Sequence, residues 1–522
     1  MNRNHSILRF TLSLSTNPSL LFCAVIITIL LILSSCDTGS KGRYKFQSES
    51  MHWLQFRGLN GSGIAPENAH PPVHFSADTN MLWKTEVLPG WSSPCIVNDR
   101  IFLTGFDDTD SLLYTLAINR ENGEILWKNF VTPDEYYSLH PINTYADPTV
   151  ASDGERIFSS FPNYGLIAYD LNGNKLWDFR HETISHSMRG SISPLVLDSL
   201  VILHICCPGD PRIVGISCQT GDSVWTIRAE EHEWASMVSR ATPVIIDDLL
   251  ILHLSNRIVA YNLVDLSVEW WIFTPTQAIG TPVIKENVLF VNTWNVGGEE
   301  SNRGKLISFT DLLKECDKDG DGLVAKGEFR EDMYVFERPE IPDAPGGSLY
   351  FKDDVFFGYF DANKDKAIDE SEWIDMLKIV APFMETHGML ALPIEGSGER
   401  LFTEIQWKVI EDTPETPSPL VVNENVLFIK NGGIMTVINR ETGEITHKDR
   451  IGAAGAYLSS PMLAANRIYT CSYNGIVSVL SADDFSVLAQ NKLKEKISAS
   501  PVAVDDVLYI RTDKNLYAFR NQ

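Results

Sequence analysis

Two short stretches of the chain carry oxygen ligands at the alternating spacing that can enclose a hard metal ion. In residues 317–328, the first loop, positions 1, 3, 5, 7 and 12 are Asp317, Asp319, Asp321, Leu323 and Glu328. In residues 361–372, the second loop, positions 1, 3, 5, 7, 9 and 12 are Asp361, Asn363, Asp365, Ala367, Asp369 and Glu372. Position 7 contributes a backbone carbonyl, and the last glutamate supplies both carboxylate oxygens to Ca²⁺, which prefers about six to eight oxygen ligands. The spacing therefore predicts a pair of calcium sites.

The two loops differ at position 6, where the chain must turn sharply. The first loop has Gly322 there, whereas the second has Lys366, which must adopt a positive φ at a cost on the order of 1 kcal/mol. We therefore expect the second loop to bind calcium more weakly than the first, or cooperatively with it. The alternative is that both loops are acidic, solvated turns that bind no metal.

Apolar residues flank both loops at helical spacing, which predicts the helix–loop–helix arrangement of the EF-hand. They are Phe309, Leu312 and Leu313 before the first loop, Phe356, Phe357 and Phe360 before the second, and Trp373 and Met376 after it. Calcium is abundant outside the cytoplasm, so we expect a structural role for the metal there rather than a sensor role.

The loops lie in the most acidic part of an acidic chain. Residues 297–406 hold 25 acidic and 12 basic side chains, and the whole chain has a formal net charge of −25. This stretch therefore carries about half of the net negative charge. Binding to phosphate backbones needs a basic face, so the charge excludes a nucleic-acid partner.

The elements around the loops form a repeat of four strands. Eight steps of Ser, Thr or Asp followed by Pro each precede a hairpin pattern; they are Ser93-Pro94, Asp147-Pro148, Ser193-Pro194, Thr242-Pro243, Thr281-Pro282, Ser418-Pro419, Ser460-Pro461 and Ser500-Pro501. A third strand, a Gly/Asn/Asp turn and a fourth strand with Trp follow, most clearly in residues 116–127. This spacing predicts an all-β, eight-bladed β-propeller over residues 53–522, with residues 297–406 inserted in the fifth copy.

The ends of the repeat array predict how the ring closes. The eighth copy stops after three strands near Tyr517, whereas residues 82–87 form a lone strand pattern before the first copy. Pairing these two segments would hide both sheet edges. We therefore expect the lone strand to complete the eighth blade.

The N-terminal segment has the pattern of an export signal. Arg3 and Arg9 precede an apolar run over residues 20–33, and Leu33-Ser34-Ser35-Cys36 resembles a bacterial lipobox. We predict a lipoprotein signal peptide over residues 1–36, lipidation of Cys36, a flexible tether over residues 37–52, and an extracytoplasmic, membrane-anchored protein. An uncleaved membrane anchor is the alternative, and the choice between inner and outer membrane stays open.

The repeat resembles a known family. The patterns ending at Trp127 and Trp225 are similar to the PQQ-type, or quinoprotein, propeller repeat. Together with the lipobox they resemble the propeller lipoproteins related to the outer-membrane β-barrel assembly factor. Residues 53–63 resemble the lead-in of a subset of these propellers, some of which carry EF-hands inside the wheel. The resemblance implies the fold rather than an activity, because propellers host unrelated functions.

Residues just before the Pro steps are expected to line the central funnel and to hold a peptide, a glycan or a small ligand. They are Trp91, Tyr145, Arg189, Arg240 and Tyr457, with His140, His186 and Trp234 on the loops leading in. The alternative is that these are ordinary inner-strand residues whose polar groups bond neighbouring backbone.

The sequence favours a non-catalytic binding or assembly scaffold, since it shows no nucleophile–base signature, and we assign no catalytic residue. A PQQ-dependent dehydrogenase is one alternative, because the resembling enzymes stack a vicinal disulfide on the quinone and Cys206-Cys207 is a vicinal pair. We do not expect PQQ, because the blades show no carboxylate calcium site beneath a cofactor. A carbohydrate-active propeller enzyme is the other alternative. Pairing of Cys206 or Cys207 with Cys218 stays open, as does the presence of free, buried thiols.

Overall fold

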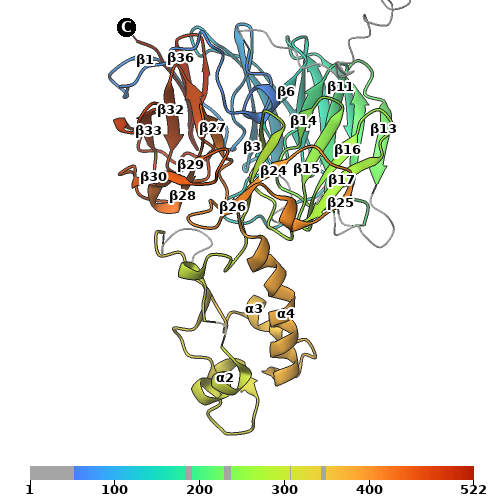
Figure 1. Cartoon of the computed structure of the whole chain (residues 1–522). Helices are drawn as coiled ribbons and strands as arrows, with labels where there is room; N and C mark the ends of the chain where they lie inside the picture. Colours follow the sequence, from blue (N-terminus) through green and yellow to red (C-terminus); the bar gives the residue numbers. More distant parts are fainter. Residues whose placement is uncertain are drawn as a thin grey trace, which may run out of the picture. The chain divides into compact units, whose positions relative to one another are not determined.

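The computed structural model describes residues 52–182, 191–207, 209–228, 237–305, 307–341 and 348–521 (Figure 1). Within these ranges the chain forms an eight-bladed β-propeller, as predicted. The first four blades are β2–β5 (Cys95–Val97, Arg100–Asp107, Leu112–Asn119, Ile125–Val131), β6–β9 (Ala151–Ser152, Arg156–Phe161, Gly165–Asp170, Lys175–Arg180), β10–β13 (Leu195–Leu197, Leu200–Ile205, Arg212–Ser217, Ser223–Arg228) and β14–β17 (Val244–Ile246, Leu249–His253, Arg257–Asn262, Val268–Phe273).

The other four blades follow the same antiparallel order. They are β18, β19, β24 and β26 (Val283–Lys285, Val288–Thr293, Gly388–Pro393, Trp407–Val409), β27–β30 (Leu420–Val422, Asn425–Lys430, Ile434–Asn439, Ile445–Arg450), β31–β34 (Met462–Ala464, Arg467–Cys471, Ile476–Ser481, Val487–Lys492) and β35–β37 with β1 (Val502–Val504, Val507–Arg511, Asn515–Phe519, Met81–Glu86). The innermost strands of most blades are fully buried, whereas outer strands such as β5 alternate between exposed and half-buried residues.

The ring closes as the sequence predicts. Strand β1 pairs antiparallel with β37, with Lys84 opposite Tyr517, so the first described strand completes the last blade (Figure 1). Apolar residues of adjacent blades pack together, and one such cluster joins β1, β37 and the strands of blades 1 and 7. Closure therefore leaves no open edge between the two ends of the array.

The Gly and Trp of the repeat hold neighbouring blades together. Trp127 of β5 donates its indole N–H to the carbonyl of Leu171 in the next blade at 3.0 Å. Gly173 in the same turn has φ +89°, and a Cβ there would lie 2.8 Å from the Trp127 ring. Only glycine allows both the positive φ and this close approach of the indole. The same contact recurs between Trp177 and Gly221.

One repeat boundary differs from the prediction. The backbone N–H of Ser93 donates to the hydroxyl of Thr149. One residue, Val150, separates Thr149 from strand β6. Thr149, rather than Asp147, therefore occupies the position of the Ser or Thr in the other copies. The sequence pattern selected Asp147-Pro148 because a Pro follows the Ser or Thr in the other seven copies. In the second copy, Val150 follows Thr149 instead.

The insertion lies between β19 and β24 of the fifth blade. It contains helices α2 (Phe309–Cys316), α3 (Asp354–Phe360) and α4 (Glu370–Thr386), and the short strands β20 (Val324–Ala325), β21 (Tyr334–Phe336), β22 (Leu349–Tyr350) and β23 (Ala367–Ile368). The predicted range 297–406 is too long, because β24 begins at Gly388 and returns the chain to the blade. Residues 398–400 form β25, which pairs parallel with β17 of the fourth blade. Sequence patterning missed these strands because the short apolar run of β24 lies between acidic residues on both sides, Glu385 before it and Glu395 and Glu399 after it.

The insertion has its own apolar core, as the helical spacing predicts. Phe309 and Leu312 of α2 are buried against Phe357 and Phe360 of α3 and Trp373 of α4. Trp373 also donates its indole N–H to the carbonyl of Ile307 at 3.0 Å. This core fixes the three helices relative to one another, which lie close together in Figure 1.

A charged cluster, here called the root cluster, joins the insertion to the sixth blade. The Lys430 ammonium at the end of β28 lies 2.8 Å from Glu299, 3.5 Å from Glu340 and 3.8 Å from Asp412. The carboxylates are at most 17% exposed. Lys430 therefore pairs with three nearly buried carboxylates, and the more exposed Lys448 pairs with one of them, Asp412, more closely, at 2.6 Å.

In the part of the chain that the structure describes, no helix is both long and apolar enough to cross a membrane. The predicted signal peptide, Cys36 and most of the predicted tether lie outside the described residues.

Candidate calcium loops and central cavity

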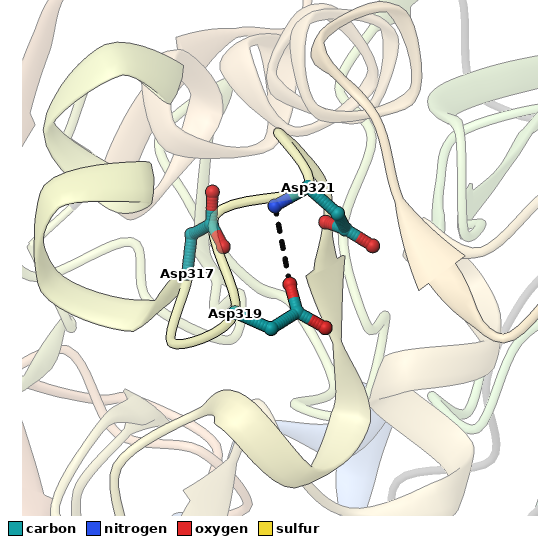
Figure 2. A group of neighbouring side chains, drawn as sticks. All are labelled: Asp317, Asp319 and Asp321. Carbon is teal, nitrogen blue, oxygen red and sulfur yellow. Dashed lines mark hydrogen bonds between the residues drawn. The ribbon is translucent and has the colours of Figure 1, made fainter.

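In the first loop, three aspartates converge on one point between α2 and β20. Figure 2 shows the carboxylates of Asp317, Asp319 and Asp321 around the turn, and one oxygen of each lies within 4.8 Å of the others. The Asp317 carboxylate accepts the backbone N–H groups of Gly320 at 2.7 Å and Gly322 at 3.1 Å. The sharp turn thus aims the three side chains inward, where their like charges repel.

The second loop has the same backbone course. Lys366 has φ +77°, the positive value expected at this position, and matches Gly322 with φ +82°. The N–H of Lys366 bonds one oxygen of Asp361 at 3.1 Å. The other oxygen, Oδ1, is buried and has no hydrogen-bond partner among the described residues, and Asp361 is 8% exposed. A buried carboxylate oxygen without a donor is a site that fits a cation ligand.

The terminal glutamates of both loops fold back over the turn. The Glu328 carboxylate accepts the N–H groups of Lys318 and Ala325 at 2.9 and 2.8 Å. The Glu372 carboxylate accepts those of Asn363 and Asp369 at 3.0 and 3.1 Å. Both oxygens of each glutamate therefore face the loop backbone. The donor set of carboxylate, amide and carbonyl oxygens is the type that Ca²⁺ takes.

A two-stranded sheet couples the loops. Val324 of β20 pairs with Ile368 of β23, and Ala325 pairs with Ala367. Because each strand lies inside one loop, a shift in one loop backbone is transmitted to the other. The sheet is therefore a physical link between the two predicted sites.

The innermost strands surround a cavity of about 870 Å³ and are joined by a closed ring of hydrogen bonds, here called the hydroxyl ring. In each blade the backbone N–H of one Ser or Thr donates to the hydroxyl of the equivalent residue in the next blade, at 2.9 to 3.4 Å. The members are Ser93, Thr149, Ser193, Thr242, Thr281, Ser418, Ser460 and Ser500, and all eight line the cavity. The Ser/Thr of the repeat is thus required for joining the blades.

Residues 53–70, here called the lead-in, close one end of this cavity. Phe56 of the lead-in lines the cavity, and Arg57 beside it is buried and donates to the carbonyl of Pro419 at 2.7 Å. Burial lowers the pKa of Arg57 to about 9. Within the described ranges the lead-in is hydrogen-bonded to seven blades, through Ile96, Ser152, Val196, Ile245, Pro419, Leu463 and Asp505. At the fifth blade, which is the remaining one, a Cβ on Gly61 would lie 3.3 Å from the side chain of Thr281.

The other end of the cavity is lined by the insertion. Helix α4 contributes Met376, Ile379, Val380, Phe383 and Met384. Helix α4 is anchored to the wheel there, because the Asn295 amide donates to the carbonyl of Phe383 at 2.8 Å and the Thr386 hydroxyl donates to that of Pro275 at 2.8 Å. The helix therefore begins in the second loop and ends against the cavity.

Charged residues at this end come from both parts of the chain. Arg338 of the insertion makes a two-pronged pair with Glu415, at 2.9 and 3.1 Å. Arg240 donates to the carbonyl of Gln277 at 2.6 Å. The guanidinium of Arg303 also lines the cavity, and its Nη1 contacts the sulfur of Met384 at 2.7 Å.

Burial shifts the pKa values of two titratable groups in the wall. It raises the pKa of Asp147 to about 7, although Thr144 donates two hydrogen bonds to this carboxylate. It lowers the pKa of His140, while the charge of Glu415 opposes that shift. Asp147 is therefore mostly protonated below about pH 7, and His140 keeps its neutral form to a lower pH than a free imidazole does.

The predicted funnel residues divide into three groups. Trp91, Arg240 and His140 line the cavity as expected. Tyr145 and Tyr457 were wrongly placed there: Tyr145 packs against Phe106 and other aromatic rings, and Tyr457 is 1% exposed and donates to the carbonyl of Ala453 at 2.8 Å. Arg189, His186 and Trp234 lie outside the described residues.

Sequence reasoning missed Arg303 and Arg338, which lie within the insertion, and Glu415, which lies three residues before the Ser418-Pro419 step. Their neighbours in space are separated from them by tens of residues, and no local pattern indicated the contact. Charge within an otherwise apolar stretch, as at Arg338 after Phe336, is the signal that was available.

The vicinal cysteines point to different partners. Cys206 lies with its sulfur 3.4 Å from Nε2 of His204, whereas the Cys207 sulfur lies 3.0 Å from the carbonyl of Asp210. Both, and Cys218, are free, buried thiols in this structure.

Comparison with known proteins agrees with this architecture. A family model described as outer membrane protein assembly factor BamB matches residues 109–305 and 388–522, so that the gap in the match falls on the insertion. Europium-containing methanol dehydrogenase superposes with a TM-score of 0.55 at 10% identity, over 91% of this chain and 98% of that one. The computationally designed Ika8 protein superposes with a TM-score of 0.51 at 8% identity, over 84% of this chain and 99% of that one. BamB from Moraxella catarrhalis superposes with a TM-score of 0.48 at 12% identity, over 84% of this chain and 98% of that one.

At such identities the two higher scores show a shared fold only. A search of curated proteins gave no match.

Proposed function

The chain belongs to the family of the outer membrane protein assembly factor BamB, and from this premise we propose that it is a calcium-binding, extracytoplasmic, non-catalytic scaffold that binds its partner at the propeller face. Family membership supports both the extracytoplasmic location and a protein partner. A glycan partner is the second class that a cavity with mixed polar and aromatic walls can accept.

One observation carries the binding role. The cavity of about 870 Å³ is preformed, because the hydroxyl ring joins all eight blades around it and the lead-in closes one end. Sites of this kind typically hold ligands in volumes of about 300 to 1,000 Å³. A preformed site loses little conformational entropy on binding, which favours recognition.

We propose further that Cys36 is lipidated and anchors the chain to a membrane. The Leu-Ser-Ser-Cys sequence after an apolar run supports this anchor. Replacing Cys36 by Ser should abolish acylation and release the chain from the membrane fraction. Cleavage and acylation that continue unchanged in that variant would refute the anchor.

We also propose that the two loops bind calcium, through Asp317, Asp319, Asp321 and Glu328 in the first and Asp361, Asn363, Asp365, Asp369 and Glu372 in the second. The converging carboxylates of the first loop and the unpartnered Oδ1 of Asp361 support this. The backbone carbonyls of Leu323 and Ala367 would complete the sites.

Calorimetry on chelator-treated protein should find one or two calcium ions per chain. Glu328→Gln should abolish the tighter site and Glu372→Gln the weaker one, because each removes a two-oxygen ligand. Glu370→Gln is the matched control, since this exposed glutamate lies inside the second loop, at position 10, and is not among the proposed ligands. No calcium uptake at millimolar concentration would refute the proposal.

Chelation should loosen the insertion and leave the wheel intact. Protease cutting should rise between about residues 300 and 400, while the β-sheet circular dichroism stays unchanged, because calcium stabilises only the form that binds it. Loss of the whole β signal would instead show that calcium holds the propeller together.

A dehydrogenase role is tested by adding PQQ and calcium to the protein. We expect no quinone absorbance after gel filtration and no dye reduction with alcohols. Stoichiometric quinone binding that is lost in Cys206→Ser would overturn the scaffold proposal.

A further inference from the structure

We propose that the insertion-facing end of the central cavity binds a small amphiphilic carboxylic acid, whose carboxylate pairs with Arg303 and whose apolar body lies along α4. This inference rests on the proposed binding role and names the chemical class of one ligand.

Arg303 is the first observation behind this assignment. Among the described residues its guanidinium has one hydrogen-bond acceptor, the thioether sulfur of Met384 at 2.7 Å. A thioether is a weak acceptor, and an arginine has five N–H donors in a planar fork. The other two arginines of the wall are held by Glu415 and Gln277. Within the described chain, Arg303 therefore has neither a carboxylate nor an amide oxygen as acceptor, and a carboxylate fits its fork.

The apolar surface beside it is the second observation. Ile379 of α4 is 58% exposed and Tyr359 of α3 is 61% exposed, although both line the cavity. Phe383 and Met384 continue the same wall next to Arg303. Covering apolar area yields about 25 cal/mol per Å², so a hydrocarbon chain or ring along this wall is favoured.

The combination selects the charge and size of the ligand. A cationic amphiphile would bring like charge to Arg303, and a neutral one would leave its donors without an acceptor. A cavity of about 870 Å³ admits a molecule with a chain of about ten carbon atoms, since ligand sites of drug-sized molecules span about 300 to 1,000 Å³. A small acid therefore satisfies both the fork and the wall.

The test uses the full-length, calcium-loaded protein and dodecanoate below its micelle-forming concentration. Calorimetry should show one dodecanoate per chain and clearly weaker binding of dodecyltrimethylammonium, which has the same tail and the opposite charge. Arg303→Met should weaken dodecanoate binding about tenfold or more, because a charge-assisted pair is lost. Arg303→Lys, which keeps the charge but not the fork, should lie between.

Lys305→Met is the matched control, because it removes the same charge from an exposed residue two positions away and should leave binding unchanged. Ile379→Glu should weaken binding by placing a negative charge on the apolar wall. Equal binding of both amphiphiles, or equal affinity in wild type and Arg303→Met, would overturn the inference. Calcium uptake measured on the same samples separates failure of dodecanoate binding from failure of the calcium proposal. A pull-down of a partner protein that dodecanoate does not affect would leave the scaffold role intact.

Discussion

Replacing Thr149 by Val removes one link of the hydroxyl ring while keeping the side-chain shape. The Thr149 hydroxyl accepts the backbone N–H of Ser93 at 2.9 Å, and both residues are 1% exposed. Val has no acceptor, so the Ser93 N–H loses its partner, which costs about 1 to 3 kcal/mol. The ring lines a cavity that water can enter, and water replaces part of the lost bond. We therefore expect Thr149→Val to lower the free energy of unfolding by about 1 to 2 kcal/mol.

The measurement is urea unfolding followed by tryptophan fluorescence, with the slope checked so that only the midpoint changes. Thr115→Val is the matched control: this residue is also buried, at 1% exposure, but its hydroxyl has no hydrogen-bond partner in the described part of the chain, so its removal should be neutral or stabilising. Thr281 and Thr242 accept bonds of 3.1 and 3.4 Å, so their Val variants should cost progressively less than Thr149→Val. Equal stability of Thr149→Val and Thr115→Val would refute a stabilising ring.

Two further predictions concern charge. Burial lowers the pKa of His204, His253 and His387 to about 4, below the value of 6.5 in the unfolded chain, so the unfolded state takes up protons first on acidification. The free energy of unfolding should therefore fall as the pH is lowered from 6.5 to 4, by about 2 kcal/mol per histidine at pH 5. His253→Gln should make this fall less steep when unfolding is measured at several pH values. An unchanged pH dependence in that variant would contradict the reasoning. Lys430→Met should free the insertion, because Glu299 and Glu340 of the root cluster then lose their cation, at a cost of about 3 to 5 kcal/mol. Lys378→Met, which removes a lysine of the insertion from an exposed pair with Asp375, should cost about 1 kcal/mol or less. Thermal unfolding and protease cutting at residues 297–387 measure this difference, and equal effects of the two lysine variants would contradict it.

The wheel could be predicted from the sequence because each blade repeats the same local requirements. A Gly that accommodates the indole of the preceding blade and a Ser or Thr that bonds the next blade recur at fixed spacing, so they are visible without coordinates. The second copy is the exception. It keeps the hydroxyl, at Thr149, but its Pro lies two residues earlier than in the other copies, so a pattern based on Pro selects the wrong position. The lone strand pattern at residues 82–87 identified ring closure because an unpaired edge has no other partner.

The candidate sites were predictable to different degrees. The calcium loops depend on spacing within 12 residues, so all proposed ligands could be named from sequence. The cavity depends on contacts between distant residues. Arg303 and Met384 are 81 positions apart, and Arg338 and Glu415 are 77 apart. Such contacts follow from how the insertion meets the wheel, which no local periodicity encodes.

The lead-in has a consequence for how the chain reaches its folded state. Its partners are distributed over nearly the whole length of the chain, and the bond between Asn68 and Asp505 spans 437 positions. Contacts of such high sequence separation form slowly, because the entropy of closing the loop is lost before the contact forms. The lead-in precedes every blade in the chain, so its full set of contacts must wait until the last blade is made. Until then seven or fewer blades form an open array with two exposed sheet edges, which is the state most prone to aggregate and the one that a chaperone would need to protect.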